Sequence, residues 1–247
     1  MITSTIPYKS FKFPVGEPHV QVTWSGNADI TWEFESVGEI VELLLLKDAL
    51  MRRGCKINRL TIPYVPFGRQ DRVMTLGEPL SIAVMCQLIN SLEANRVIIT
   101  DPHSDVTPAL LNNCTVIEQH EVFTTCFPIS FGMTYLVSPD GGALKKIYKL
   151  AKVTSLGVLE CSKQRNVSTG EITGVYIPGI TKLGGITCVI VDDICDGGRT
   201  FVELAKELQA RGAKRIILMV THGFFTKGLQ VFDGLIDEIY TRKGRVK

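Results

Sequence analysis

The stretch that decides the fold is VIVDDICDGGRT, residues 189–200. An apolar run leads into paired aspartates, and paired glycines follow a third aspartate before an arginine and a threonine. Such an apolar run is typical of a strand buried in a parallel sheet. Glycines after it allow backbone conformations that point successive N–H groups at one anion, and a following helix adds its positive N-terminal end. The stretch therefore predicts a strand, a phosphate-binding loop and a helix.

Carboxylates beside this loop indicate what the phosphate is attached to. Asp192 and Asp193, at the expected end of the strand, can hold Mg²⁺ or accept hydrogen bonds from sugar hydroxyls, and Asp196 lies on the loop itself. The stretch is neither a P-loop nor a dinucleotide fingerprint, because it lacks G-x-x-x-x-G-K-[ST] and G-x-G-x-x-G. A phosphorylated sugar suits such a loop. Taken alone, the stretch also fits a capped turn with solvated acids.

Short apolar runs alternate with longer helical patterns along the chain, which favours an α/β fold with mainly parallel sheets flanked by helices. After an early β region at 19–35, strands are expected at 59–65, 96–101, 134–139, 154–160, 187–193 and 215–220. Helices are expected near 79–93, 141–152 and 199–211. In such sheets ligands bind at the carboxyl ends of the strands. The polar residues of this sequence follow the strands there.

The chain has 247 residues, of which 45% are hydrophobic, so it can bury one large core or two small ones. Two comparable α/β stretches are separated near residues 128–134, where the sequence reads PISFGMT. We therefore expect two half-domains, residues 1–132 and residues 133–247.

The first helix is expected between Ser36 and Gly54. Ser36 and Glu39 have the spacing of a capping box, and Gly54 can end the helix. Trp24 and Trp32 carry no motif and are expected to pack against a sheet face.

Charge and cysteine usage exclude several classes of protein. Lys and Arg number 27 against 25 acids and lie scattered, so we expect no nucleic-acid partner. No apolar run approaches the ~18 residues of a bilayer span, and the first residues lack the plan of a signal peptide, which predicts a cytoplasmic protein without a membrane partner. Seven cysteines without a C-x-x-C pair argue against a disulfide framework and a zinc site, and most are expected in the core.

Further stretches, taken in order, carry a resemblance to a known family. They are PYVPFGRQDR (63–72), VIITDPH (97–103), VSPDGG (137–142) and SKQRNVSTGEITG (162–174). Together with VIVDDICDGGRT, which is similar to the PRPP-binding loop of type I phosphoribosyltransferases, they resemble the motifs of ribose-phosphate pyrophosphokinases, the PRPP synthetases. The resemblance covers about residues 11–241. It implies two type I phosphoribosyltransferase-like half-domains, each a mainly parallel β-sheet flanked by helices.

The implied reaction is a Mg²⁺-dependent transfer of the β,γ-diphosphoryl group of ATP to the C1 hydroxyl of ribose 5-phosphate, giving PRPP and AMP. A homo-oligomer, at least a dimer, is also implied. FKFPVGEPHV (11–20) resembles the family's R-F-S-D-G-E-V, whose aromatic and acidic residues reach the adenine of a neighbouring subunit. Phe13 and Glu17 match this pattern. Val15 replaces its aspartate, so one polar contact to the base is missing.

The resemblance also implies a role for each matching residue. The catalytic residues would be Lys163, Arg165 and His103. ATP would be bound by Phe13, Glu17, Arg69, Gln70 and Asp71. The ribose phosphate would be bound by Asp192, Asp193, Asp196, Gly197, Gly198, Arg199 and Thr200. Mg²⁺ would be held by His103, Asp140, Asp192 and Asp193. Without the resemblance, the Lys163 stretch would read as a solvated loop and the Arg69 stretch as a surface ion-pair network.

The loop departs from the family's D-T-G-G-T, because a glycine stands at Gly197 for the threonine and an arginine at Arg199 for a glycine. Arg199 can replace the lost contact and leave ribose 5-phosphate as the acceptor. It can instead bind a second phosphate, as in ADP-ribose, or point to solvent from the first helical turn. These three interpretations stay open on the sequence.

Rival functions differ in the residues they require. A non-catalytic, synthetase-associated regulatory homologue would be expected to lack loop cations or metal-binding acids, which are present here. A phosphoribosyltransferase that consumes PRPP would not need the ATP motifs. The chain is shorter than the family pattern at both ends, so the family's regulatory sites and hexameric assembly are not carried over.

Overall fold

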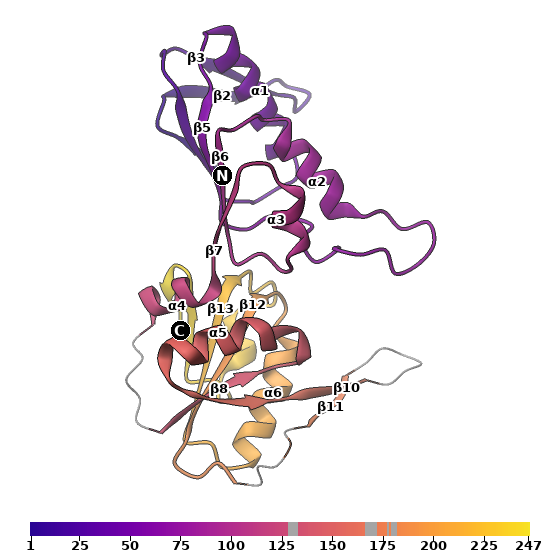
Figure 1. Ribbon diagram of the computed structural model, residues 1–247, viewed down its shortest axis with the longest axis vertical. Helices are drawn as coiled ribbons and strands as arrows, with labels where there is room; N and C mark the ends of the chain where they lie inside the picture. The colour runs from indigo at the N-terminus through magenta and orange to yellow at the C-terminus, as the bar shows by residue number, and fades with distance from the viewer. Residues whose placement is uncertain (128–132, 166–171, 177, 179–181) are drawn as a thin grey trace. The chain divides into compact units, whose positions relative to one another are not determined.

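The protein is represented by a computed structural model, which describes residues 1–127, 133–165, 172–176, 178 and 182–247. For residues 163–165 and 172–176 the description is of the backbone. The chain forms two compact units, Met1–Ile117 and Glu118–Lys247, each shown in Figure 1. The division precedes the expected boundary at residue 132. The reason is helix α4 (Gln119–Cys126), which packs against α5 and β13 of the second unit.

The first unit is built on a five-stranded sheet in the order β1-β4-β5-β6-β7. Strands β4 to β7 are parallel, and only β1 runs antiparallel to its neighbour. The strands are β1 (Ile2–Ser4), β4 (Ala28–Trp32), β5 (Ile57–Ile62), β6 (Arg96–Thr100) and β7 (Cys114–Ile117). The helices are α1 (Glu39–Arg52), α2 (Ser81–Asn90) and α3 (Val106–Leu110). A separate antiparallel hairpin consists of β2 (Tyr8–Lys12) and β3 (Pro18–Val22).

The start of α1 differs from the expected capping box. The helix begins after Gly38, and no side chain of the described residues caps its first turn. Glu39 does reach back to the N–H of Ser36, at 3.3 Å, but it also accepts a hydrogen bond from the Trp32 indole at 2.9 Å. The carboxylate of Glu39 is therefore shared between the N–H of Ser36 and the indole of Trp32. Gly54, with φ of +70°, follows the end of the helix as expected.

The tryptophans have different environments. Trp32 is fully buried in the first core, as predicted. Trp24 is 63% exposed, so the prediction that it packs against a sheet was wrong. It follows β3 rather than lying on it, and its carbonyl accepts a hydrogen bond from the guanidinium of Arg53 at 2.9 Å.

The second unit is built on a six-stranded sheet in the order β15-β14-β13-β12-β8-β9, in which β15 alone is antiparallel to its neighbour. The strands are β8 (Thr134–Ser138), β9 (Gly157–Glu160), β12 (Thr187–Cys195), β13 (Arg215–Gly223), β14 (Glu238–Thr241) and β15 (Gly244–Arg245). The helices are α4, α5 (Leu144–Thr154) and α6 (Arg199–Ala210), with short 3₁₀ helices η1 (Gly141–Ala143) and η2 (Leu229–Phe232). A two-stranded ribbon is formed by β10 (Ser162–Arg165) and β11 (Ile172–Tyr176).

Both faces of β12 are covered, which explains its continuous apolar sequence. Val189 and Val191 pack in one core with α4 and α5, which lie beside each other (Figure 1). Cys188 and Ile190 pack in another core, with α6. A strand buried on both faces has no polar face to alternate with its apolar one. The predicted parallel α/β architecture is confirmed, and each of the six expected later strand runs overlaps a strand.

All seven cysteines are free, and five of them are buried, as expected for core residues. Among the described residues, no helix has the length and apolar character needed to cross a membrane.

Candidate active site

The carboxyl end of β12 presents an acid pair, although the strand is longer than predicted. It continues to Cys195 because Ile194 and Cys195 pair with His222 and Gly223 of β13. Asp192 and Asp193 therefore lie within the last part of the strand rather than at its very end. The backbone N–H of Asp193 donates to Asp192 Oδ1 at 2.9 Å. The two carboxyl groups also interact with each other through their charges and a side-chain hydrogen bond.

This pair is electrostatically unfavourable when both groups are ionised. Burial, together with the neighbouring charge and hydrogen bond of Asp193, raises the pKa of Asp192 well above its usual range. Asp140 contributes a smaller repulsion in the same direction. Asp193 has a cation nearby, because Lys146 Nζ lies 3.7 Å from Asp193 Oδ2. A divalent cation at Asp192 would relieve the repulsion that remains.

Asp140 follows β8, a parallel neighbour of β12, and so lies at the same edge of the sheet. Its carboxylate caps η1 by accepting hydrogen bonds from the N–H groups of Gly142 and Ala143, at 3.0 and 3.3 Å. Ser138 Oγ donates to the carbonyl of Asp140 at 2.7 Å. This acid is therefore oriented by its own turn.

Asp140, Asp192 and Asp193 carry carboxylates, which are the type of ligand that Mg²⁺ prefers. Within the described parts of the chain, no group of three or more His, Cys, Asp or Glu side chains lies close enough to hold a metal ion by itself. Mg²⁺ commonly keeps several waters and binds through one or two carboxylates plus substrate phosphates. The Asp192–Asp193 pair supplies oxygen ligands of that type. His103 belongs to the first unit, and the four-residue metal set stays a prediction.

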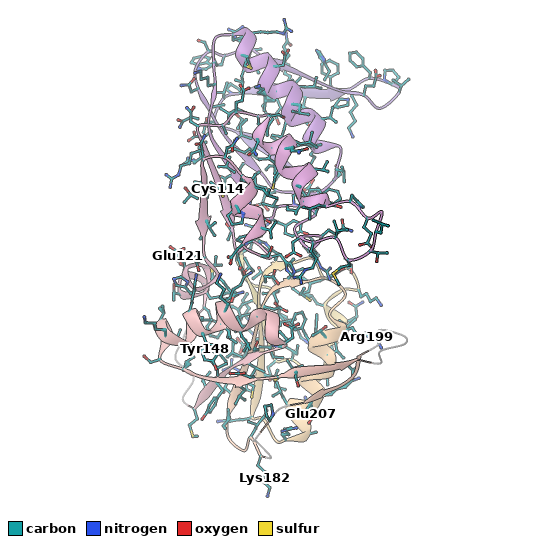
Figure 2. The ribbon with its side chains drawn as sticks, turned by 45° about the vertical axis from the view of Figure 1, so that its right-hand side comes forward. Cys114, Glu121, Tyr148, Lys182, Arg199 and Glu207 are labelled. Atoms are coloured by element: carbon teal, nitrogen blue, oxygen red, sulfur yellow. The ribbon has the colours of Figure 1, made fainter. Side chains whose placement is uncertain are left out.

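The loop after β12 leads into helix α6, as the sequence predicted. Gly198 is the N-cap of α6 with φ of +79°, and no described side chain caps the helix start. A Cβ atom on Gly198 would lie 2.5 Å from Cζ of the buried Phe232, so glycine is required for space as well as for conformation. The first backbone N–H groups of α6 have no partner within the helix. Figure 2 labels Arg199 at this end of α6 and Glu207 farther along it.

In the first unit, four predicted ATP and catalytic residues meet at one cavity. It has a volume of about 440 Å³ and is lined by Arg69, Gln70, Asp71 and His103 among others. Their segments follow β5 and β6, which are neighbouring parallel strands, so both reach the same edge of the sheet. The volume is within the range of small-molecule sites.

Asp71 is stabilised in its charged form at this cavity. Burial by itself would raise the pKa of Asp71, but hydrogen bonds from Ser104 and Arg72 and the charges of Arg72 and His103 lower it. The Arg72 Nε to Asp71 Oδ1 distance is 3.1 Å. Ser104 was missed by the sequence analysis, and its only signal is its position beside His103.

The Phe13 and Glu17 pair lies at the turn of the β2–β3 hairpin. The N–H of Phe13 donates to the carbonyl of Glu17 at 2.9 Å. The ring of Phe13 is 45% exposed and lies 5.6 Å from the ring of His19 and 5.4 Å from that of Phe11. The hairpin therefore presents an exposed aromatic cluster. His19 was missed, although its register opposite Phe11 follows from the turn.

Lys163 and Arg165 lie on β10, where the sequence analysis expected a loop. Their backbones pair with Val175 and Ile172 of β11, and the register shifts between Gln164 and Arg165. The two ends of the expected loop therefore pair as antiparallel strands and form a two-stranded ribbon. Residues 166–171, the middle of the expected catalytic loop, lie outside the described residues.

Residues 164–242 match the family described as the Phosphoribosyl synthetase-associated domain. The ribose-phosphate pyrophosphokinase of Pyrococcus abyssi is 33% identical over 224 residues, which cover 88% of this chain and 76% of that protein. The ribose-phosphate pyrophosphokinase of Thermococcus kodakarensis is 32% identical over 235 residues, covering 92% of this chain and 82% of that protein.

The fold is similar to that of a solved phosphoribosylpyrophosphate synthetase from Mycobacterium smegmatis. The TM-score is 0.78 at 21% sequence identity, and the match covers 96% of this chain and 80% of that one. This likeness shows the fold, and the sequence identity over most of the chain shows the family. The chain belongs to the ribose-phosphate pyrophosphokinase family of enzymes.

Proposed function

We propose that the protein transfers the β,γ-diphosphoryl group of Mg·ATP to the C1 hydroxyl of ribose 5-phosphate, producing PRPP and AMP. The observation that carries this proposal is the end of β12, where an acid pair precedes an uncapped helix start with glycine at its N-cap. Such a helix start binds a phosphate ester, and adjacent carboxylates accept hydrogen bonds from a sugar. The family of the chain supports the same reaction.

ATP would bind in the first unit. The 440 Å³ cavity brings the guanidinium of Arg69, the amide of Gln70 and the imidazole of His103 to one place, and phosphates favour such donors. Asp71 holds the neighbouring side chains of Ser104 and Arg72. These residues would position the triphosphate.

The acceptor sugar would bind in the second unit. Backbone N–H groups at Gly198 to Thr200 would hold its phosphate, and Asp192 and Asp193 would orient its hydroxyls. The acid pair would hold Mg²⁺, which would supply neutralisation of phosphate charge. Lys163 and Arg165 would stabilise the charge that develops on the transferred group. Positioning and neutralisation are the main requirements of this chemistry.

A homo-oligomer completes the proposal. Phe13 and Phe11 expose their rings on the β2–β3 hairpin at 45% and 46%, respectively. An exposed aromatic pair of this kind suits stacking on the adenine of a neighbouring subunit. A monomeric form would then have low activity.

One observation favours a second acceptor. Arg199 is exposed at the first position of α6, where a guanidinium can reach a second phosphate (Figure 2). ADP-ribose carries such a phosphate, whereas ribose 5-phosphate does not. The chemistry at C1 would be unchanged.

The test is AMP release from Mg·ATP with ribose 5-phosphate and, separately, with ADP-ribose. Lys163→Ala serves as the blank, because removing one charge-stabilising group should lower kcat by about 10²–10³-fold. Faster release with ribose 5-phosphate supports PRPP synthesis. Faster release with ADP-ribose supports the second acceptor. No release above the blank with either sugar would leave the regulatory homologue as the better interpretation.

A further inference from the structure

The side chain of Lys227 lies along the phosphate loop, although nothing in the sequence links it to that loop. A Cβ atom placed on Gly197 would lie 3.5 Å from Cδ of Lys227 and 3.6 Å from both Cγ and Cε. The methylene stem of Lys227 therefore covers one face of Gly197. The ammonium is one bond beyond Cε.

The backbone around Lys227 is fastened to the same loop. The N–H groups of Phe224 and Thr226 donate to the carbonyls of Cys195 and Asp196, at 2.8 and 3.1 Å. Thr226 Oγ1 also donates to Asp196 Oδ1 at 2.7 Å. These bonds fix the segment after β13 against the turn after β12. The position of Lys227 is thus set by main-chain contacts rather than by its own side chain.

Residues after Lys227 also help to fix the position of its backbone. Gln230 Nε2 donates to the carbonyl of Lys227 at 2.9 Å, and the N–H of Gly228 donates to the carbonyl of Phe225 at 2.7 Å. Phe225 packs edge-on against Phe232, with ring centroids 6.2 Å apart. The two loop glycines therefore face two side chains of one segment: Gly197 faces Lys227 and Gly198 faces Phe232.

The residue at position 197 limits the space that is available to the side chain of Lys227. A Cβ atom there would already be in van der Waals contact with the lysine stem, so the further atoms of a threonine would compete with that stem for room. Because glycine has no side chain, the stem of Lys227 can occupy this space. The threonine of the family pattern would bring a hydroxyl donor to the loop, and here the methylene stem of Lys227 lies on that side instead.

The charge of Lys227 is available to a ligand. Its side chain is exposed to solvent. Placed beside an uncapped helix start, a lysine ammonium adds a point charge that a phosphate dianion would attract.

We propose that Lys227 is a specificity-determining residue of the acceptor site: its ammonium binds the phosphate ester of the sugar held at Gly197 to Thr200. This inference rests on the proposed function, because it assigns a partner to the phosphate of that acceptor. It predicts that Lys227 contributes to recognition of the phosphorylated sugar and not to recognition of ATP.

The first experiment compares Lys227→Met, which keeps an apolar stem, with Lys227→Arg, which keeps the charge. Lys227→Met should raise the KM for ribose 5-phosphate about tenfold, since a hydrogen bond to a charged group is lost. The KM for ATP and the Tm should be unchanged, and Lys227→Arg should restore most of the affinity. Lys214→Met, at the exposed residue just before β13 and thus at the opposite edge of the same sheet, is the control. An unchanged KM for ribose 5-phosphate in Lys227→Met would overturn the inference.

A second experiment separates this inference from the proposed reaction. Calorimetric titration of ribose 5-phosphate into the protein without ATP measures acceptor binding alone. Binding that weakens in Lys227→Met supports the inference even if no AMP is released by the wild type. Equal binding by Lys227→Met and the wild type overturns it even if PRPP is made.

The coupling at Gly197 has its own test. Gly197→Thr alone should weaken ribose 5-phosphate binding, because the new side chain displaces the lysine stem. Gly197→Thr combined with Lys227→Ala should bind more tightly than Gly197→Thr alone, because the hydroxyl then has room. Additive losses in the double variant would show that the two residues do not share space and would contradict the inference.

Discussion

Two aspartates, one in each unit, have opposite electrostatic environments. Asp71 at the cavity of the first unit has a lowered pKa, because Ser104 and Arg72 donate to its carboxylate against the cost of burial. Asp192 at the end of β12 has a raised pKa, because burial and the carboxylate of Asp193 both disfavour its charge. The charge of Asp71 is stabilised within its own unit, whereas the charge of Asp192 is disfavoured within its unit.

The difference separates a positioning group from a binding group. A carboxylate that already has its donors, like Asp71, organises the side chains around it. A crowded carboxylate such as Asp192 destabilises the folded chain until a cation or a hydrogen-bond donor arrives. Active sites commonly keep such unfavourable arrangements because they bind the ligand that relieves them.

The largest effect should come from removing the crowded acid. Asp192→Asn should lower the rate of AMP release about 100-fold, equivalent to about 2.7 kcal/mol in transition-state stabilisation. The physical reason is the loss of a charged ligand for Mg²⁺ and the sugar. The control is Asp233→Asn, because the Asp233 side chain is 69% exposed and forms an ion pair with Lys247. Near-normal turnover by Asp192→Asn would mean that the crowded pair is not at the reaction centre.

A smaller effect concerns Mg²⁺ itself. At about tenfold its Kd, the ion should raise the free energy of unfolding of the wild type by about 1.4 kcal/mol. Asp71→Asn should keep this response, and Asp192→Asn should lose most of it. Urea unfolding with and without MgCl₂ measures the difference. Equal responses from the two variants would remove the distinction between the two acids.

The smallest effect, of opposite sign for the two acids, concerns stability without metal. At neutral pH Asp71→Asn should lower the free energy of unfolding by about 1 kcal/mol, because a buried hydrogen-bond acceptor is lost. Asp192→Asn should raise the free energy of unfolding, because the wild-type carboxylate is disfavoured there. Urea unfolding in EDTA checks both signs.

The pH dependence sharpens this last comparison. The stabilisation from Asp71 is present above the ordinary carboxyl pKa of about 3.9 and is lost as pH falls through its lower folded pKa. The penalty at Asp192 is absent below the ordinary pKa and grows as pH rises toward its higher folded pKa. For both variants, the difference from the wild type in the free energy of unfolding should therefore shrink below about pH 4. A deficit of Asp71→Asn that persists there would point to lost packing rather than lost charge.

Local patterns were enough to predict the parts of the site that follow strands. The run before Asp192 predicts a buried strand, and Gly198 has the left-handed conformation that its place before α6 requires. The segment of His103 was expected at the end of a strand, and it lines one cavity together with Arg69. Short-range sterics and hydrophobic periodicity determine such features, so they can be read from neighbouring residues.

Other elements depend on distant partners. The short strands β7 and β14 were not predicted, since CTVI and EIYT become strands only by pairing with β6 and β13. Helix α4 was not predicted, and the expected boundary at residue 132 differs from the observed one because the contacts of α4 with α5 are tertiary. Likewise, the pattern at Ser36 predicts a capping box, but the carboxylate of Glu39 also accepts a hydrogen bond from the indole of Trp32.

The sequence alone determined the α/β class, the family motifs and the acid–glycine order at 189–200, because each depends on residues that are close in the chain. Only the tertiary structure decided that Lys227 lies against Gly197 and that Asp193 has Lys146 as its cation. These pairs are distant in sequence and meet because parallel strands bring their carboxyl ends to one edge. No local pattern encodes which side chain will fill the space beside a glycine. That choice is made when the elements pack.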